Sequence, residues 1–177
     1  MIEVTVQSLG LDRSSNTPVV ILQERDGARV LPIWIGPGEA SAIAMELAGM
    51  NFSRPLTHDL MASAIKGLGG RLKRVVITKV VENTYYAEMI IARDSEYFSL
   101  DARPSDSIAI ALRMDAAIYT SEELLEHTSI EISEAADFED PDTDEPGEKP
   151  GSDTRPPENL KEYLRRLHPE DFGRFTP

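Results

Sequence analysis

The segment Arg54–Asp59 (RPLTHD) places an arginine, a histidine and an aspartate within six residues, at a predicted loop-to-helix junction. Histidine can transfer protons near neutral pH, arginine pairs with phosphate, and aspartate can bind a hard cation. The other two histidines of the chain, His127 and His168, follow the last predicted helix of the domain or lie in the tail. The segment therefore predicts either a site for phosphate chemistry around His58 or a surface histidine at the start of a helix.

A second polar segment, Asp101–Asp106 (DARPSD), lies where a predicted strand ends and a predicted helix begins. Such junctions are common positions for functional sites in proteins built from strands and helices. Two aspartates five residues apart, with Arg103 between them, have the composition to hold a divalent metal beside a phosphodiester. The same side chains also suit an ion-paired corner that fixes the junction, and both interpretations stay open.

The starts of two predicted helices resemble each other. Residues 37–44 (PGEASAIA) and 104–111 (PSDSIAIA) both fit the pattern Pro-x-acid-small-x-Ala-Ile-Ala. Proline is favoured in a first helical turn, and an acid there interacts favourably with the helix dipole, by about 0.3–1 kcal/mol. Spacing alone therefore favours a structural reason for Glu39 and Asp106. The pattern fits an internal duplication and also a shared way of leaving a sheet to start a helix.

The order of the predicted elements indicates an α+β fold. Apolar runs and alternation predict strands at 2–6, 18–23, 30–35, 74–81, 85–92, 97–101 and 117–119. Helical spacing predicts helices at 39–47, 56–68 and 105–113, and a capping-box pattern at 120–123 opens a brief last helix. Short polar turns between consecutive strands predict antiparallel pairing. We therefore expect a compact single domain with a mixed, mainly antiparallel sheet and about three helices packed on one face of it.

Length and composition limit the classes of protein to which the chain can belong. A chain of 177 residues has room for one domain with a real core. It contains no cysteine, which excludes disulfides and thiolate metal sites. The opening segment MIEVTVQSLGLD has no apolar stretch long enough for a signal peptide or a membrane span. We therefore expect a cytoplasmic protein that does not bind a membrane.

The net charge of −13 is unevenly distributed along the chain. Residues 1–130 hold 17 acids and 12 bases, whereas residues 131–158 hold 11 acids and 2 bases. An acidic domain lacks the surface of a high-affinity nucleic-acid binder. It is weaker evidence against a nuclease, because bound metal ions would supply positive charge. The clustered bases Arg71, Lys73, Arg74 and Lys79 are expected to be split between the two faces of a strand.

The C-terminal part of the chain differs in character from the domain. Residues 131–158 are rich in proline, glycine and acids and have almost no large apolar side chain, which predicts a disordered acidic linker. Residues 159–177 begin with NLKEYLRRL, which predicts a short amphipathic helix with Asn159 as its N-cap. The apolar face of this helix either docks on the domain at 1–130 or binds a protein partner as a linear motif.

Three blocks in this order resemble the bifunctional nuclease domain family. They are LPIWIG with Glu39-Ala40 in residues 31–40, RPLTHDL in residues 54–60, and DARPSDSIA in residues 101–109. The resemblance covers about the first 130 residues and implies a compact α/β domain that cleaves both DNA and RNA. It therefore implies nucleic acid as the substrate, and it also implies self-association, for which we expect a homo-oligomer with a dimer favoured.

The resemblance also implies which residues form the site. The positions that match the family's polar signature are Glu39, Arg54, His58, Asp59, Asp101, Arg103, Ser105 and Asp106. We expect Asp59, Asp101 and Asp106 to bind Mg²⁺ or Mn²⁺ and to act in catalysis. We expect His58 to be the general base or acid. Arg54, Arg103 and Ser105 are expected to bind the phosphate of the substrate.

Two other functions fit the same residues. A non-catalytic regulatory or adaptor domain would bind a phosphorylated small molecule or a nucleotide at its helix N-termini, and its tail would present NLKEYLRRL to a protein partner. A self-assembling structural module would use the polar corners only to hold the fold. Metal-dependent cleavage favours the nuclease, whereas stabilisation by a ligand without turnover favours the adaptor.

Overall fold

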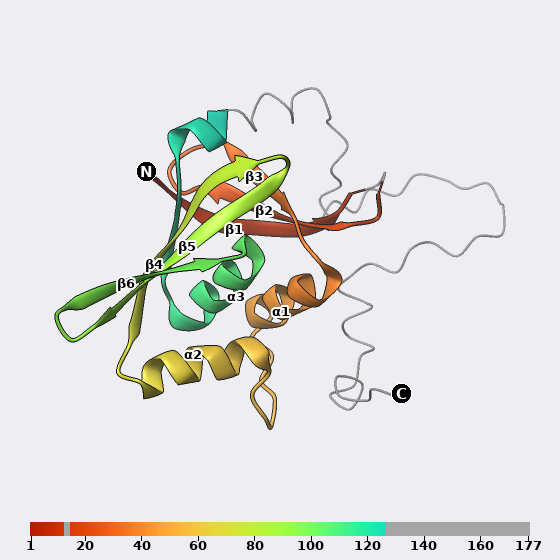
Figure 1. Cartoon of the computed structure of the whole chain (residues 1–177). Coiled ribbons are helices and arrows are strands. Elements are labelled where there is room, and N and C mark those ends of the chain that lie inside the picture. Colours follow the sequence, from red (N-terminus) through yellow and green to blue (C-terminus); the bar gives the residue numbers. More distant parts are fainter. Residues whose placement is uncertain (13–14, 127–177) are drawn as a thin grey trace, which may run out of the picture. The chain divides into compact units, whose positions relative to one another are not determined.

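Strands and helices follow one another in the order that the sequence predicts. The structure, a computed structural model, describes residues 1–12 and 15–126. The elements are β1 (Ile2–Leu11), β2 (Pro18–Glu24), β3 (Val30–Trp34), α1 (Pro37–Leu47), α2 (Thr57–Gly67), β4 (Arg71–Val81), β5 (Thr84–Arg93), β6 (Glu96–Ala102), α3 (Pro104–Met114) and β7 (Ala117–Thr120) (Figure 1). The predicted acidic linker and C-terminal helix lie outside the described residues.

The seven strands form one sheet in the order β3-β2-β1-β7-β4-β5-β6. Neighbouring strands are antiparallel, except that β4 and β7 run parallel. Parallel neighbours need a crossover connection, and here β5, β6 and α3 supply it. The prediction of an α+β domain with a mixed, mainly antiparallel sheet is therefore confirmed.

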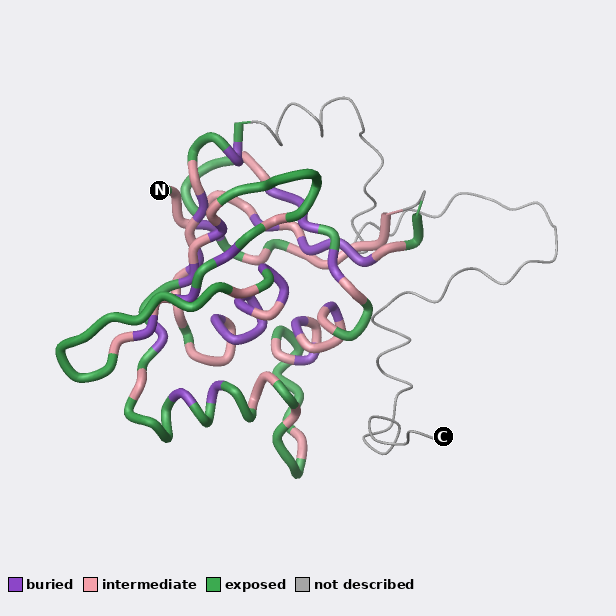
Figure 2. The backbone as a smooth tube through the Cα atoms, in the orientation of Figure 1, coloured by how far each residue is buried: buried purple, intermediate pink, exposed green. Residues whose placement is uncertain are grey.

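Helix α3 lies at the centre of the helical layer. It packs against both α1 and α2 and also contacts β4 and β5, and the three helices lie on one side of the sheet (Figure 1). From Pro104 to Ala111, every residue of α3 except Asp106 is buried. Figure 2 shows the same pattern, with buried segments running along α3 and the central strands. Because α3 is enclosed in this way, the position of its first turn, which carries Asp106, is fixed by the core.

The brief last helix begins one residue later than the capping-box pattern suggests. Residues 122–126 are helical up to the end of the described part of the chain. The N–H of Leu124 donates to the Oγ atom of Ser121 at 3.2 Å, which makes Ser121 the N-cap. Thr120 is buried and ends β7 instead.

Strand β4 pairs with β5 through two β-bulges, one at Lys73 and one at Thr78. Each bulge adds one residue to β4 and so resets the alternation of its side chains. As a result, three basic residues pair with residues on the outward face of β5, in the pairs Arg71–Ala92, Arg74–Ile90 and Lys79–Tyr86. All four bases of the cluster are exposed. The prediction that the strand would split them between two faces is therefore wrong.

Candidate active site

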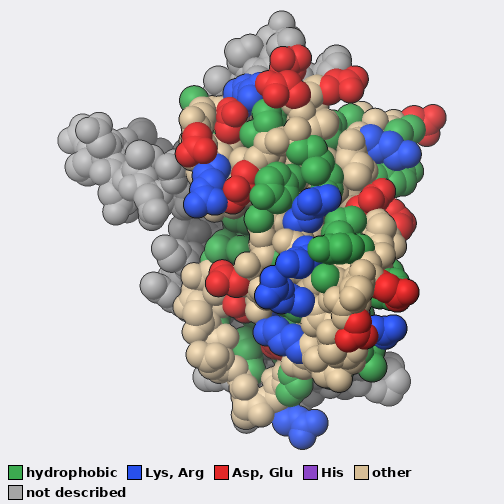
Figure 3. All heavy atoms as spheres, turned by 90° about the vertical axis from the view of Figure 1, so that its left-hand side faces the viewer, with side chains coloured by type: hydrophobic (Ala, Val, Ile, Leu, Met, Phe, Trp, Pro, Cys, Tyr) green, Lys and Arg blue, Asp and Glu red, His purple; other side chains and the backbone are tan. Residues whose placement is uncertain are grey.

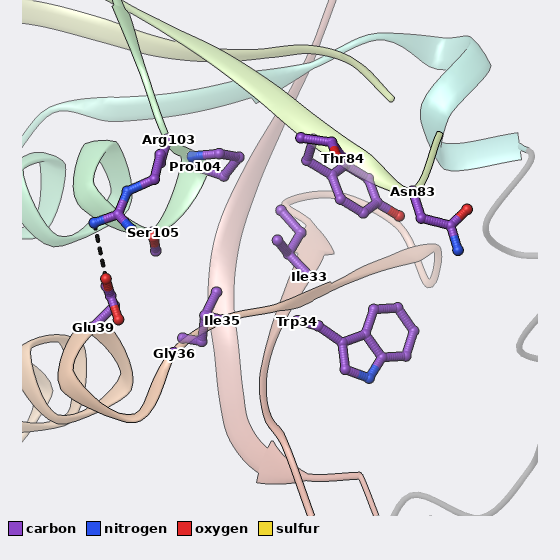
Figure 4. A pocket seen from close by; sticks show the side chains of 11 residues that line it. Ile33, Trp34, Ile35, Gly36, Glu39, Asn83, Thr84, Arg103, Pro104 and Ser105 are labelled. Carbon is purple, nitrogen blue, oxygen red and sulfur yellow. Dashed lines mark ion pairs between the residues drawn. The ribbon is translucent and has the colours of Figure 1, made fainter. Parts of the chain in front are cut away.

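Three chain connections surround a cavity of about 290 Å³. They are the connection from β3 to α1, the turn between β4 and β5, and the connection from β6 to α3 (Figure 4). The polar and aromatic residues of its lining are Trp34, Glu39, Thr84, Tyr85, Arg103 and Ser105. Ligand pockets commonly enclose about 300–1,000 Å³, so this cavity has the size for a small polar ligand or for one unit of a polymer.

A chain of four charged or polar side chains leads from the cavity into the helical layer. Arg103 lies 2.8 Å from Glu39 of α1 (Figure 4) and donates through Nε to Oδ2 of Asp106 at 2.8 Å. The other carboxylate oxygen of Asp106 lies 3.1 Å from Nε2 of His58 on α2. This chain joins α1, α2 and α3 and brings together four of the eight residues that the sequence singled out.

The charge of Asp106 selects the tautomer of a neutral His58 ring. Partial burial acts to raise the pKa of Asp106, but the hydrogen bonds from Arg103 and His58 outweigh it, and the pKa lies below the ordinary carboxyl value. Ionised Asp106 can only accept, so Nε2 of His58 must carry the hydrogen. In a neutral imidazole, Nδ1 then holds the free lone pair. No described residue forms a hydrogen bond with Nδ1, and this nitrogen can therefore take up a proton.

The first turn of α3 adds hydrogen-bond donors to the wall of the cavity. Arg103 is the N-cap of α3 and Pro104 follows it, and the first N–H groups of a helix have no partner within the helix. Ser105 is only 7% exposed and lines the cavity. Its hydroxyl makes no hydrogen bond with any residue of the described part of the chain. A hydroxyl that reaches the cavity without a hydrogen-bond partner among the described residues, a helix N-terminus and a guanidinium are together suited to binding an anion.

The ion pairs of Asp106 predict a specific acid response. Because the folded pKa of Asp106 lies below its ordinary value of 3.8, these contacts stabilise the fold above that pH, and the stabilisation is lost as the pH falls through the folded pKa. We expect Asp106→Asn to be less stable than wild type at about pH 7, and this difference to shrink progressively as the pH falls below the ordinary carboxyl pKa of 3.8. Urea unfolding followed by circular dichroism measures the stability of both proteins. A constant difference between the two proteins at every pH would contradict the assignment.

Asp59 belongs to a different cluster. Burial acts to raise its pKa, but hydrogen bonds from Arg113 and from the N–H of Leu56 lower it below the ordinary value. The side chain of Arg113 is only 6% exposed and also donates to the carbonyl oxygens of Ala109 and Ala42, at 2.9 and 3.2 Å. Asp59 therefore neutralises a buried cation that ties the three helices together, and it does not line the cavity.

Arg54 and Asp101 lie outside both clusters. Arg54 is exposed and makes no hydrogen bond or ion pair with any described residue. Asp101 is exposed on β6, where it pairs with Glu88, and its neighbours in sequence pair with buried residues of β5. Asp101 therefore points away from the helices, on the opposite face of the sheet from Asp106.

The three predicted metal ligands are not gathered around one point. Within residues 1–12 and 15–126, no group of three histidine or acidic side chains is arranged to hold a metal ion. Asp106 and Asp59 each bind an arginine, and Asp101 lies on the other face of the sheet. The described residues therefore do not fit an ion held by these three carboxylates together. Glu39 is the carboxylate that lines the cavity.

Trp34 is a cavity residue to which the sequence assigned no role. It is 44% exposed, and its indole N–H donates to Oδ2 of Asp12 at 2.9 Å, which fixes the orientation of the ring. The segment VLPIWI reads as a continuous apolar run, so nothing in it predicts that this ring faces outward. Its only signal is that Trp34 is the single tryptophan of the chain.

The fold and the site define the class of this protein: an α+β domain with a mixed sheet and a polar cavity at the starts of α1 and α3. Residues 20–133 match the bifunctional nuclease domain. The chain belongs to this family. Among the residues described, no helix is long and apolar enough to cross a membrane.

The chain is also similar to individual proteins. It is 41% identical over 170 residues to an uncharacterised protein of Mycobacterium tuberculosis. This alignment covers 96% of this chain and 97% of that protein. It is 25% identical over 128 residues to bifunctional nuclease 1 of Arabidopsis thaliana. It is 26% identical over 134 residues to bifunctional nuclease 2 of Oryza sativa subsp. japonica. These two alignments cover 70% and 73% of this chain but only 39% and 41% of the plant proteins.

Proposed function

We propose that this protein is a nuclease that hydrolyses phosphodiester bonds in DNA and RNA, with its active site at the cavity beside α3. The observation that carries the proposal is the chain from the cavity-lining Arg103 through Asp106 to His58, because it joins an anion-binding wall to a base. The names of the plant relatives support the same class of reaction, and the alignments cover only part of the length of those proteins.

Arg103, Ser105 and the first turn of α3 bind the phosphate in this proposal. Glu39 and Asp106 hold two nitrogens of the Arg103 guanidinium, so the side chain is oriented before the substrate arrives. Groups that are already oriented stabilise the charge of a transition state without a cost of reorganisation. The Ser105 hydroxyl donates to a second phosphate oxygen.

His58 acts as the general base in this proposal. Nδ1 takes a proton from a water molecule as the water oxygen attacks phosphorus. The bond from phosphorus to the leaving ester oxygen breaks, and that oxygen receives the proton. Water as the nucleophile serves both nucleic acids, because DNA lacks the 2′-hydroxyl. His58 is 14% exposed and does not line the cavity, so its proton transfer runs through water between the ring and the phosphate.

Dependence on Mg²⁺ or Mn²⁺ remains part of the proposal. Magnesium is usually held by one or two carboxylates together with the phosphates of a substrate. Glu39 would be the protein ligand, because it is the carboxylate on the cavity wall. The ion would supply positive charge for the phosphate oxygens, and the steps assigned to the protein's own side chains do not pass through it.

A cleavage assay tests the proposed reaction. Purified protein is incubated with labelled single-stranded RNA and DNA in the presence of Mg²⁺, Mn²⁺ or EDTA. We expect cleavage of both substrates with metal and none with EDTA. The rate must follow the protein concentration across a gel-filtration peak, which separates the protein's own activity from a contaminant. Cleavage that leaves the peak, or none at all, would contradict the proposal.

One observation favours a second candidate, a non-catalytic domain that binds a phosphorylated ligand. Arg103 and Ser105 line the cavity, whereas His58 does not. A nucleoside monophosphate that raises the melting temperature of the protein, with no cleavage in the assay above, would favour this candidate.

Trp34 is expected to position the substrate by stacking on a base. Base–aromatic stacking contributes about 1–3 kcal/mol per base, so Trp34→Ala should raise the KM for a short oligonucleotide about 5-fold to 150-fold. The kcat should change little, because the ring does not touch the reacting groups. Trp34→Phe keeps a ring and should retain most of the affinity. A loss confined to kcat would contradict this role.

We further propose that the protein acts in the cytoplasm and forms a homo-oligomer, with a dimer favoured. We also propose that the C-terminal segment 159–177 offers a site for a protein partner.

The dimer has a candidate surface at strand β6. This strand lies at an edge of the sheet and is exposed along most of its length. An edge strand with free backbone groups can pair with a second chain. Sedimentation equilibrium measures the mass in solution, and a monomer at micromolar concentration would contradict the dimer.

A further inference from the structure

The outward face of β4, β5 and β6 carries exposed basic and aromatic side chains together. On the left-hand side of Figure 1, where these strands lie, Figure 3 shows basic side chains in a row with hydrophobic side chains beside it. The bulges of β4 place Arg71, Arg74 and Lys79 on this outward face, and Lys73 is exposed at the first bulge. The helices cover the other face, so this group is separate from the active site.

A hollow of about 390 Å³ lies at one end of this face. Arg71 and Lys73 form part of its lining, and so does Tyr97, which is 70% exposed. Arg71 and Tyr97 both pair with Ala92, one from each neighbouring strand. The small side chain of Ala92 therefore separates an aromatic ring from two cations and leaves room for a planar group between them.

We infer that this face is a binding surface for single-stranded nucleic acid, in which a base stacks on Tyr97 and the phosphates lie along β4 at Arg71, Lys73 and Arg74. A basic groove with aromatic rings is how proteins bind single strands without sequence preference. At the other end of β4, Lys79 lies 5.0 Å from the centre of the Tyr86 ring and repeats the combination. The inference rests on the proposed function only for the class of ligand.

Acidic residues on the same face limit the strength of this binding. Asp94 lines the hollow, and Glu88 and Asp101 lie opposite each other on β5 and β6. Strand β4 itself, from Arg71 to Val81, contains no acid, so the backbone of the ligand follows this strand. Binding to so few cations is weak and depends strongly on salt.

The hollow and the active-site cavity lie toward opposite ends of β5. Tyr85 lines the cavity and Ala92 lines the hollow, and at about 3.4 Å per residue these two positions are about 24 Å apart. A dinucleotide cannot reach both places, whereas a strand of about 12 nucleotides can, since single-strand sites cover about 4–16 nucleotides. Ligands of the two lengths therefore report on the two sites separately.

The test measures fluorescence anisotropy of a labelled 12-nucleotide single-stranded RNA with full-length protein in EDTA, at several salt concentrations. We expect Tyr97→Ala to weaken binding about 5-fold or more. Arg71→Gln with Arg74→Gln should lower the slope of log affinity against log salt by about 1.4, or about 0.7 for each phosphate contact. Lys66→Gln removes an exposed cation from α2 and should change neither value. In a separate assay with Mg²⁺ in place of EDTA, all four proteins should cleave a dinucleotide at the same rate.

Each result separates this surface from the proposed reaction. Weaker binding in the β4 and Tyr97 variants supports the inference even if the protein cleaves nothing. No binding by wild type at low salt, or affinities within 2-fold in both variants, would overturn it. Displacement of the RNA by poly-glutamate, with Tyr97→Ala as tight as wild type, would also overturn it and would identify a surface for acidic peptides.

Discussion

Replacing Asp106 with asparagine is expected to lower kcat for phosphodiester hydrolysis about 10²-fold to 10⁴-fold, the range that general acid–base catalysis contributes. The carboxylate of Asp106 accepts the hydrogen of Nε2 and so leaves Nδ1 of His58 free to act as a base. An asparagine amide can donate to Nε2 instead, which favours the tautomer that carries its hydrogen on Nδ1. Nδ1 of His58 would then carry a hydrogen and could not take a proton from the attacking water.

Two further variants show whether this loss comes from His58. His58→Ala should lower kcat by a similar factor, and the double variant should be no slower than the slower single variant, because residues that act as a unit are not additive. Asp115→Asn is the matched control, since Asp115 makes the C-cap of the same helix and is exposed. Circular dichroism checks that each variant is folded. Losses that multiply in the double variant would show that Asp106 and His58 act independently.

Replacing Arg113 with alanine is expected to lower the free energy of unfolding by about 2–4 kcal/mol. The guanidinium is buried, pairs with Asp59 and donates to carbonyl oxygens of α1 and α3. Its removal leaves a partly buried carboxylate and the carbonyl of Ala42 without this donor. Breaking a fully buried pair costs about 3–5 kcal/mol, and the partial exposure of Asp59 reduces that figure.

Urea unfolding at neutral pH measures the effect of Arg113. Arg113→Lys keeps the charge but loses the planar fork, so it should fall between alanine and wild type. Arg54→Ala is the matched control, because Arg54 is exposed and has no partner among the described residues, and it should change stability by less than about 0.5 kcal/mol. A loss below about 0.5 kcal/mol in Arg113→Ala would show that the buried cation does not hold the helices together.

The elements with the most regular spacing were predicted well from the sequence. The predicted helix at 105–113 is α3, Pro104–Met114, because its apolar period and its proline start leave little ambiguity. Strand β1 reaches Leu11, well beyond the predicted end at residue 6, because a register shift between Val6 and Ser8 breaks the alternation while pairing continues. The bulges of β4 escaped prediction for the same reason, since a bulge has no signal in the hydrophobic pattern.

The site was only partly predictable, because its contacts differ in sequence separation. Arg103 and Asp106 are three residues apart on one helix turn, and an ion-paired corner there was one of the two interpretations left open. His58 and Asp106 are 48 residues apart, and only the packing of α2 on α3 brings them together. The sequence does not predict in which direction the side chains of Asp59 and Asp101, the expected metal ligands, point. In the structure, Asp59 contacts Arg113, and Asp101 lies on the face of the sheet opposite the helices.

The intrinsic fluorescence of Trp34 reports whether a nucleotide occupies the proposed active site, because the only tryptophan of the chain lines the cavity. Wild-type protein is titrated with a dinucleotide in EDTA, and Arg103→Gln is titrated in parallel. We expect a saturable change in fluorescence, with half-saturation at a clearly higher concentration in Arg103→Gln. Cleavage of the dinucleotide in the presence of metal, together with no change in Trp34 fluorescence on titration, would show that the active site lies elsewhere.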